Sequence, residues 1–388
     1  MTGEGRSVTI LGVTGSVGRN TADLILRDRD RFTVEAVTAN ESVNELASMA
    51  RDLGARCAVI GKSELYGPLC DALEGSGIEA MAGPEAIVEA ADRPSDWLMG
   101  AISGAAGLDP LLTAIRRGAI VALANKEALI CAGDLVMDEV AASGARLLPV
   151  DSEHNAIYQV FDFDQTAKVD ALILTASGGP FRTWTVEAMK DATPEQAVAH
   201  PNWKMGAKIS VDSATLMNKG LELIEAYHLF PVDERQIEIV VHPQSVIHSM
   251  VSYVDGSVLA QLGTPDMRTP IAYTLAWPAR MVGPSERLNF AQIGSLTFEV
   301  PDIERFPALS LARQALQLGG SAPTILNAAD EVAVAGFLAG NIGFLDIISI
   351  VSQTLERVSV RPLESLDDVG EVDAEARCVA RSLIGKRC

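Results

Sequence analysis

The chain has 388 residues, a length that suits two or three domains. Hydrophobic residues make up 48% of it, and its formal net charge is −20. Nucleic acids and anionic lipid surfaces are bound mainly by clustered lysines and arginines, so this charge argues against both kinds of partner, although a small phosphorylated ligand can occupy a locally basic pocket. No apolar run reaches the roughly 18 residues of a membrane-spanning helix. The chain enters a strand without a signal segment, so we expect a cytoplasmic protein.

A glycine-containing turn follows the first predicted strand, at residues 7–13, and precedes a helix that ends near residue 29. Gly12, Gly15 and Gly18 lie in or beside this turn. A strand, a glycine turn and a helix form the layout in which backbone N–H groups bind a pyrophosphate. The spacing is GxxGxxG rather than the usual GxGxxG, so a tight turn without a ligand is the alternative.

The second predicted strand, at 32–39, ends where nucleotide-binding enzymes distinguish NAD from NADP. NAD enzymes commonly have an acid there, and NADP enzymes have a basic or small polar residue. This chain continues with Asn40, Glu41 and Ser42, which favour neither cofactor.

Helices and strands alternate in the following segments. The predicted helices lie at 43–54, 63–73 and 108–117, and the predicted strands at 57–60, 97–102 and 120–124. This alternation predicts a parallel, doubly wound sheet in an α/β domain. Asn125, Lys126 and Glu127 follow the last of these strands, at the edge where open α/β sheets bind ligands. Lys126 could face a nicotinamide or a substrate there, and a capped helix start is the alternative.

Two carboxylates follow a further predicted strand at 145–150. Asp151 and Glu153 are two residues apart, so in extended backbone both point to the same side. Two such groups repel each other unless a cation lies between them, and their oxygens suit Mg²⁺ or Mn²⁺. The alternative is a helix N-terminus, with Asp151 or Ser152 as cap and Glu153 in the first turn.

A polar stretch at 200–222 is the other candidate site. Its first part is predicted as a loop, and a helix capped by Asp212 or Ser213 is predicted to follow. Asn218 and Glu222 are four residues apart and share a face of that helix. The amide, the carboxylate and a neighbouring ammonium indicate a site for a small anionic substrate, with a solvated surface helix as the alternative.

Several neighbouring strands and a run of helices complete the chain. Strands are predicted at 171–175, 237–241, 251–253 and 257–262, the last two joined by a hairpin at Asp255-Gly256. Because no crossover helices separate the later strands, this part is predicted to be α+β. Residues 278–307 are rich in Pro, Gly and charge and indicate a connector. Helices follow at 309–318, 323–338, 345–358 and 374–383.

These segments together resemble one family, 1-deoxy-D-xylulose 5-phosphate reductoisomerase. The resemblance rests on LGVTGSVG, ALANKEALI, LLPVDSEHNAIYQ, LTASGGPFR, HPNWKMGAKISVDSATLMNKGLELIEA, the block from VHPQSVIHS to AYTLAWP, and LNAADEVAVAGFLAG. It implies a Rossmann-like NADPH domain at 1–150, a catalytic and dimerisation domain at 151–277 with a flap at about 200–207, a linker at 278–307 and a helical domain at 308–388.

The resemblance also implies a reaction and its partners. A phosphorylated ketose is rearranged to a branched aldehyde, which NADPH reduces to 2-C-methyl-D-erythritol 4-phosphate on the non-mevalonate route to isoprenoids. A divalent ion, Mg²⁺ or Mn²⁺ with Co²⁺ as a further option, holds two substrate oxygens. The expected assembly is a homodimer, with no nucleic-acid or membrane partner.

The family's site residues transfer to matching positions. The implied metal ligands are Asp151, Glu153 and Glu222; with Lys126 they form the implied catalytic group, in which Glu153 also moves a proton. The implied substrate contacts are Lys126, Ser152, Glu153, Ser177, His200, Trp203, Met205, Ser213, Asn218, Lys219 and Glu222. The implied cofactor contacts are Thr14, Gly15, Ser16, Val17, Asn40, Asn125, Glu127 and Gly206.

One position departs from the family. Many members have a basic residue after the second strand, beside the adenosine 2′-phosphate, and this chain has Glu41. NADPH is still expected, with Asn40 and Ser42 offering hydrogen bonds. Without the resemblance, the residues would favour a dehydrogenase of small hydroxy or semialdehyde substrates, or an inactive NADPH sensor. Three carboxylates beside a nicotinamide argue against the sensor.

Overall fold

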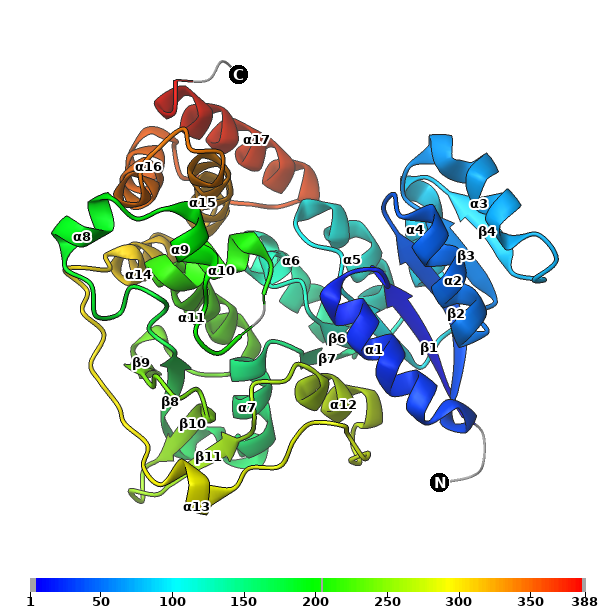
Figure 1. Cartoon of the computed structure of the whole chain (residues 1–388), viewed down its shortest axis with the longest axis horizontal. Helices are drawn as coiled ribbons and strands as arrows, with labels where there is room; N and C mark the ends of the chain where they lie inside the picture. The colour runs from blue at the N-terminus through cyan, green and yellow to red at the C-terminus, as the bar shows by residue number, and fades with distance from the viewer. Residues whose placement is uncertain (1–4, 204, 386–388) are drawn as a thin grey trace. The chain divides into compact units, whose positions relative to one another are not determined.

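The computed structural model describes residues 5–203 and 205–385, which form two compact units (Figure 1). The first unit contains residues up to 128, 136–155 and 266–286. The second contains 129–135, 156–265 and the chain from 287 onward. The predicted domain boundaries divide the chain by function and not by compactness, and they stay a prediction.

The first unit is built on a seven-stranded parallel sheet with the order β4-β3-β2-β1-β5-β6-β7. Its strands are β1 (Arg6–Leu11), β2 (Phe32–Ala39), β3 (Cys57–Ile60), β4 (Glu79–Ala82), β5 (Trp97–Gly100), β6 (Ile120–Leu123) and β7 (Arg146–Pro149). Its helices are α1 (Ser16–Arg27), α2 (Val43–Leu53), α3 (Tyr66–Leu73), α4 (Pro84–Asp92), α5 (Leu108–Arg116) and α12 (Arg268–Ala276). The doubly wound sheet is confirmed, and β4 and α4 were not predicted.

A late segment of the chain contributes to the core of this first unit. Ile271 and Leu275 of α12 are fully buried in one hydrophobic cluster with strand residues such as Val8 and Val37. The guanidinium of Arg6 donates to the carbonyl oxygen of Leu275 at 2.6 Å. Burying one such aliphatic side chain contributes about 1.5–3 kcal/mol, so α12 is an integral part of the unit.

Two helices contain residues of both units. Helix α6 (Glu127–Ser143) has a non-helical residue at Ala132, and α7 spans Ser152–Val160. A helix start at this point was the alternative that the sequence analysis considered for Asn125, Lys126 and Glu127, and α6 does begin at Glu127, although no side chain caps it among the described residues.

The second unit combines a mixed four-stranded sheet with helices. The sheet has the order β11-β10-β8-β9 and contains β8 (Val169–Ala176), β9 (Ile237–Val241), β10 (Ile247–Tyr253) and β11 (Val258–Leu262). Strands β8 and β9 are parallel, whereas β10 is antiparallel to both β8 and β11. The predicted α+β organisation and the hairpin between β10 and β11 are confirmed.

The helices of this unit include the predicted C-terminal group. They are α8 (Val186–Lys190), α9 (Pro194–Val198), α10 (Ala207–Thr215), α11 (Met217–Leu229), α13 (Phe290–Ile293), α14 (Ala308–Leu318), α15 (Ala322–Leu338), α16 (Phe344–Arg357) and α17 (Leu366–Leu383). Within the described residues, no helix combines the length and the apolarity needed to cross a bilayer.

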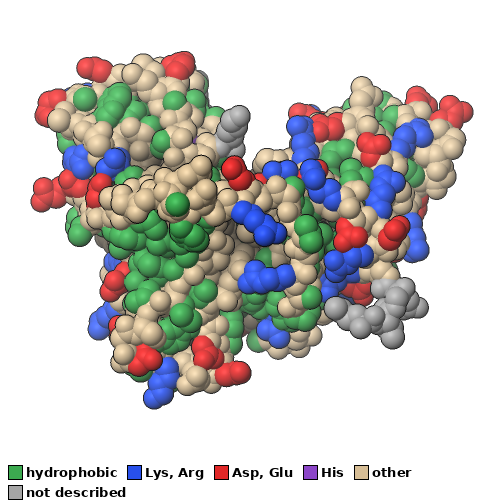
Figure 2. All heavy atoms as spheres, turned by 60° about the horizontal axis from the view of Figure 1, so that its bottom comes forward, with side chains coloured by type: hydrophobic (Ala, Val, Ile, Leu, Met, Phe, Trp, Pro, Cys, Tyr) green, Lys and Arg blue, Asp and Glu red, His purple; other side chains and the backbone are tan. Residues whose placement is uncertain are grey.

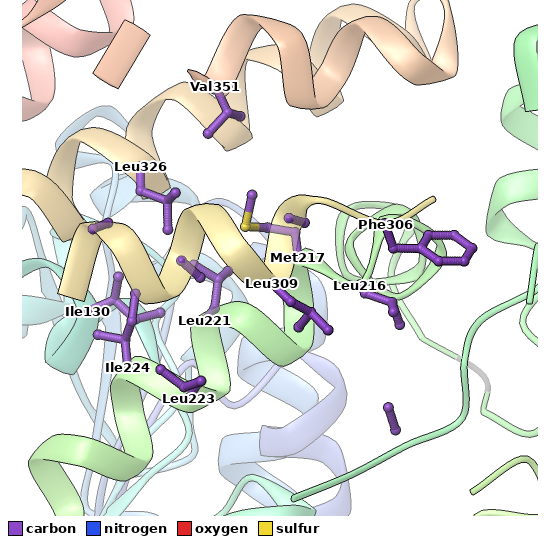
Figure 3. Close-up of a cluster of buried hydrophobic side chains, with 14 of the residues drawn as sticks. Ile130, Leu216, Met217, Leu221, Leu223, Ile224, Phe306, Leu309, Leu326 and Val351 are labelled. Atoms are coloured by element: carbon purple, nitrogen blue, oxygen red, sulfur yellow. The ribbon is translucent and has the colours of Figure 1, made fainter. Parts of the chain in front are cut away.

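Helix α11 lies inside the hydrophobic core of the second unit. Leu221 and Ile224 of α11 are buried among Leu309 of α14, Leu326 of α15 and Val351 of α16 (Figure 3). This packing fixes the rotation of α11 about its axis. The polar residues of the same helix are therefore held in defined directions, which is what a binding site requires.

The break between α10 and α11 corrects the predicted helix start. Asp212 and Ser213 lie inside α10 and do not cap the helix that carries Asn218. The break occurs at Leu216, which has a φ of 63° and is buried. A leucine in the left-handed region costs about 1–2 kcal/mol, and burial of its side chain offsets that cost.

Candidate functional site

The glycine turn of the first unit lies where the strand order reverses. Strand β1 has β2 on one side and β5 on the other, and open α/β sheets bind ligands at such a switch point. Gly12 has a φ of 84°, and a Cβ atom there would lie 2.6 Å from the carbonyl oxygen of Ala101. A Cβ at Gly18 would lie 2.3 Å from the Gly12 oxygen. Both glycines are therefore required by the turn itself.

Gly15 has neither constraint. Its φ is −75°, and an added Cβ would approach the Gly12 oxygen only to 3.4 Å. Gly15 and Ser16 are exposed at the start of α1, and among the described residues no side chain caps this helix. The N–H groups of the first helical turn attract an anion. The predicted cofactor residues Thr14 to Val17 thus include the exposed and uncapped start of α1.

Asn125 lies at the same edge of the sheet, after β6. Its side chain is 2% exposed, and its Nδ2 donates to the carbonyl oxygen of Gly104 at 3.1 Å. Within residues 5–203 and 205–385, no donor is bonded to its Oδ1. A buried oxygen without a donor costs about 1–3 kcal/mol, so a ligand N–H or O–H at this position would be favoured.

A cation and a carboxylate meet at the ends of β6 and β7. These strands are neighbours, so the residues that follow them lie side by side. The Nζ of Lys126 lies 2.5 Å from Oδ2 of Asp151, and both side chains are largely buried. The Ser152 hydroxyl donates to Oε2 of Glu153 at 2.5 Å. Glu127 begins α6 beside Lys126.

The backbone of the Asp151–Glu153 segment differs from the extended form that the sequence analysis considered first. The Asn155 N–H donates to the carbonyl oxygen of Asp151, and α7 begins at Ser152. Asp151 therefore takes the cap position and Glu153 lies in the first turn. The prediction of an extended strand end is wrong here, and the alternative of a helix N-terminus is right, because β7 already ends at Pro149.

A hydroxyl and an imidazole come together in the second unit. Nε2 of His200 lies 2.8 Å from the hydroxyl of Ser177, just after β8. Nδ1 of His200 accepts from the N–H groups of Trp203 and Asn202 at 2.9 and 3.2 Å. Nδ1 is therefore unprotonated and Nε2–H donates to Ser177. Ser177 also accepts from the Gly179 N–H at 3.1 Å, so its own O–H can donate to an anion.

The Ser177 turn packs directly on the end of α10. Gly179 has a φ of 68°, and a Cβ there would lie 2.5 Å from the carbonyl oxygen of Ser213. Only glycine allows this approach. The structure thus brings together three predicted substrate residues, Ser177, His200 and Ser213, with the N-terminus of α11 following Leu216.

Three polar side chains of α11 form one hydrogen-bonded group, as their spacing predicts. The Asn218 amide donates to Oε1 of Glu222 at 2.5 Å, and the Lys219 ammonium donates to Oε2. Lys219 and Glu222 are 4% and 1% exposed. A buried carboxylate is costly unless it is paired, and these two donors provide that pairing for Glu222 inside the unit.

The predicted flap is attached at its base. The Asn202 amide donates to the Pro243 oxygen at 2.7 Å and to the Ser245 hydroxyl at 2.8 Å. The Trp203 ring lies 6.0 Å from the His248 ring, centroid to centroid. Met205 is half-buried and Gly206 is at the N-cap of α10, while Lys204 lies outside the described residues. Sequence reasoning missed the anchoring role of Asn202, for which the adjacent Pro201 is the only local signal.

A buried charge cluster near the flap was also missed. Nζ of Lys208 lies 2.7 Å from Oδ2 of Asp212 and 3.1 Å from Oδ2 of Asp330. Lys208 and Asp212 are four apart and could have been predicted as a helical ion pair. Asp330 is distant in sequence, and nothing local indicates that it joins them.

These features define the class of dinucleotide-binding α/β proteins, here with a second unit whose hydroxyl, amide and ammonium groups suit a phosphorylated ligand. Family models match three parts of the chain. They are 1-deoxy-D-xylulose 5-phosphate reductoisomerase at 8–133, its C-terminal domain at 147–230, and the DXP reductoisomerase C-terminal domain at 262–379.

Relatives and solved structures agree over nearly the whole chain. The 1-deoxy-D-xylulose 5-phosphate reductoisomerase of Rhodospirillum centenum is 61% identical, over 98% of this chain and 94% of its own length. That of Zymomonas mobilis is 56% identical over 98% of each. The solved Zymomonas mobilis enzyme in complex with NADPH has a TM-score of 0.95 at 55% identity, covering 98% of this chain and 99% of its own.

A second solved structure, a DOX-P reductoisomerase in complex with NADPH, fosmidomycin and magnesium, has a TM-score of 0.91 at 41% identity over 98% of each chain. The chain belongs to the 1-deoxy-D-xylulose 5-phosphate reductoisomerase family.

Proposed function

We propose that this chain converts 1-deoxy-D-xylulose 5-phosphate to 2-C-methyl-D-erythritol 4-phosphate by metal-dependent isomerisation and NADPH-dependent reduction, on the non-mevalonate route to isoprenoid precursors. The observation that carries the proposal is the likeness over the full chain, with 61% identity across 98% of it. The related structures solved with NADPH and magnesium support the same two cofactors here.

The first unit supplies the proposed NADPH site. Thr14, Gly15, Ser16 and Val17 would hold the pyrophosphate with the N–H groups at the start of α1. Asn125, Glu127 and Asn40 would contact the cofactor at the same sheet edge, and Gly206 would do so from the flap. Among the described residues, no donor is bonded to Oδ1 of Asn125, so this oxygen can accept from an N–H or O–H group of the cofactor.

Asp151, Glu153 and Glu222 are the proposed ligands of one divalent ion. An all-carboxylate donor set suits a hard cation such as Mg²⁺ or Mn²⁺, with Co²⁺ as a further option, and does not suit a structural zinc. The ion would supply Lewis acidity to the ketone and the neighbouring hydroxyl of the substrate. The Nζ of Lys126 lies 2.5 Å from Oδ2 of Asp151, so this ammonium would lie beside the ion's donor set.

The proton and charge movements are assigned to two side chains. Glu153 would accept a proton from a substrate hydroxyl, with Ser152 hydrogen-bonded to its carboxylate at 2.5 Å to orient it. Lys126 would stabilise the substrate oxygen that gains negative charge. Both roles use groups at the carboxyl edge of the parallel sheet, where the nicotinamide is expected.

The second unit supplies the proposed phosphate site. Ser177 and Ser213 offer hydroxyls from two segments that Gly179 brings into contact. Asn218 and Lys219 add an amide and a cation near the N-terminus of α11. A local cation and helix N–H groups explain how a protein of net charge −20 can bind a phosphate. His200 would contact the substrate beside Ser177.

Trp203 and Met205 are proposed to cover the bound substrate. The loop that carries them is fixed at its base by Asn202 and His200, so it can close without losing its attachment. Closure would exclude water from the reactive aldehyde.

A homodimer and a cytoplasmic location complete the proposal. Strand β11 is an edge strand within the described residues, and its Val258 and Leu259 are 51% and 48% exposed. Hydrophobic side chains also gather on the face of this unit seen in Figure 2. Exposed apolar edges mark association surfaces. Sedimentation velocity tests the dimer. The cytoplasmic location is proposed because NADPH and sugar phosphates are metabolites of the cytoplasm.

The activity is tested by following NADPH absorbance with purified protein and 1-deoxy-D-xylulose 5-phosphate, with Mg²⁺ and with EDTA. The proposal predicts oxidation of NADPH that requires both the substrate and the metal. Oxidation that continues in EDTA, or none in the presence of metal, would contradict it.

A further inference from the structure

The carboxyl ends of β1, β2 and β3 place three loops in a row in the first unit. β2 pairs with β1 on one side and with β3 on the other. The Val13 N–H donates to the Thr38 oxygen at 2.8 Å, which ties the pyrophosphate turn to the end of β2. Ala39 and Ile60 are register partners, so the residues after β3 lie beside Asn40 and Glu41.

The loop after β3 is bonded closely to the loop after β2. The Gly61 N–H donates to the Ala39 oxygen at 2.8 Å, and the Lys62 N–H donates to the Asn40 oxygen at 3.1 Å. A Cβ at Gly61 would lie 2.9 Å from Oδ1 of Asn40, so a larger residue would push the loops apart. These hydrogen bonds therefore hold the backbone of Lys62 beside Asn40, the first residue after β2.

The side chain of Lys62 reaches the acid that departs from the family pattern. Its Nζ lies 2.5 Å from Oε2 of Glu41, and the two side chains are 44% and 60% exposed. The hydrogen bond from Lys62 lowers the pKa of Glu41, which is therefore ionised at neutral pH. A basic group is thus present beside the end of β2, although it comes from the next strand along the sheet.

We propose that Lys62 is the residue that recognises the 2′-phosphate of NADPH in this chain, and that Glu41 opposes it by favouring the 2′-hydroxyl of NADH. The inference rests on the proposed use of NADPH. In dinucleotide-binding folds the adenosine ribose lies beside the residues after the second strand, where a carboxylate binds ribose hydroxyls and a cation binds a 2′-phosphate.

The two charges have opposite effects on the two cofactors. A 2′-phosphate beside the pair gains a charge-assisted hydrogen bond from Lys62 and suffers repulsion from Glu41. A 2′-hydroxyl can donate to Glu41 and gains little from an ammonium. Lys62 suits exchange between these partners, because its ammonium is a point charge on a flexible stem. The pair therefore sets the preference for NADPH over NADH.

The test compares binding of 2′,5′-ADP with 5′-AMP, and of NADPH with NADH, by titration calorimetry at low and physiological salt. Lys62→Ala should weaken binding of 2′,5′-ADP and NADPH about tenfold and leave 5′-AMP and NADH unchanged. Lys62→Arg should retain most of the difference. Because the pair is exposed, the effect should shrink as salt rises.

Arg56 provides a matched control. It pairs at 2.8 Å with Glu35 of β2, just before the start of β3 and so at the opposite end of that strand from Lys62. Arg56→Ala should change none of the four affinities. Glu41→Gln removes the opposing charge, so it should tighten NADPH binding and weaken NADH binding, each by a few fold.

Several results would overturn the inference. Lys62→Ala would do so if it weakened the binding of 2′,5′-ADP and 5′-AMP, or of NADPH and NADH, by equal factors, or if it weakened none of them. Wild-type protein that binds 2′,5′-ADP no more tightly than 5′-AMP would do so too. Loss of discrimination in Arg19→Ala instead would assign the role to that arginine, which pairs with Glu45 at 2.6 Å. Normal turnover of the substrate with unchanged discrimination in Lys62→Ala would refute the inference alone. Absent turnover with altered discrimination would refute the proposed activity alone.

Discussion

The charge cluster of Lys208, Asp212 and Asp330 supports a prediction about stability. One ammonium serves two carboxyls that are 2% and 0% exposed. Burial, and then the charge of Asp212, raises the pKa of Asp330 well above its usual value. We therefore expect Asp330 to hold a proton at pH values where an exposed aspartate has lost it, while Lys208 and Asp212 form the ion pair.

Two substitutions separate the roles in this cluster. Asp330→Asn replaces a protonated carboxyl by a neutral amide of the same shape, so stability should change by less than about 1 kcal/mol at acidic pH, where the unfolded carboxyl is protonated too. Lys208→Met leaves Asp212 buried without its cation. Removing one partner of a buried pair costs about 3–5 kcal/mol, and the low end applies because Lys208 is 32% exposed.

The pH dependence has a definite sign. A raised carboxyl pKa stabilises the folded state below the ordinary aspartate pKa, and this contribution is lost as pH rises through the folded value. Wild-type protein should therefore gain stability over Asp330→Asn as pH falls from 7 toward 4. Calorimetric melting temperatures measure both effects. About 3 kcal/mol corresponds to a fall of roughly 6–12 °C for a unit of this size.

One outcome would refute this reasoning directly. If Asp330→Asn lowers the melting temperature at pH 7 as much as Lys208→Met does, Asp330 is ionised and is the true partner of the lysine. Parallel pH profiles for wild type and Asp330→Asn would lead to the same conclusion.

Three further predictions concern the site. Glu222→Gln should abolish turnover and leave NADPH binding intact, measured by cofactor fluorescence; loss of both would make the residue structural. Trp203→Ala should weaken substrate affinity more than metal affinity in calorimetric titrations, and equal losses would argue against a covering role. Ser177→Ala should raise the KM for the phosphorylated substrate about tenfold, since one charge-assisted hydrogen bond is lost, and an unchanged KM would remove Ser177 from the phosphate site.

Much of the first unit could be predicted because its local signals agree with its tertiary structure. The bounds of β2 and β3 match the predicted strands, since β3 is a fully buried apolar run and β2 is buried through its second half. Strand β4 escaped prediction because Glu79–Ala82 is a short edge strand with no β-branched residue. Edge position, which the sequence does not reveal, allows such a segment to pair.

The candidate site residues drew attention by their chemistry or by the family resemblance, but their local backbone was not predicted. Asp151 and Glu153 drew attention as paired carboxylates, yet they open a helix. Nothing in the sequence indicates the turn at Leu216, because a left-handed leucine is unfavourable except where packing enforces it. Lys62 and Asp330 were missed for a related reason: each meets its partner through strand register or helix packing between distant segments.

The central claim is that one chain both rearranges and reduces its substrate. The most direct measurement is NMR identification of the product when limiting NADPH is consumed with 1-deoxy-D-xylulose 5-phosphate and Mg²⁺. We predict one molecule of 2-C-methyl-D-erythritol 4-phosphate, with its branched carbon skeleton, for each NADPH oxidised. An unbranched reduced pentose phosphate would contradict the account, because the chain would then be a simple dehydrogenase.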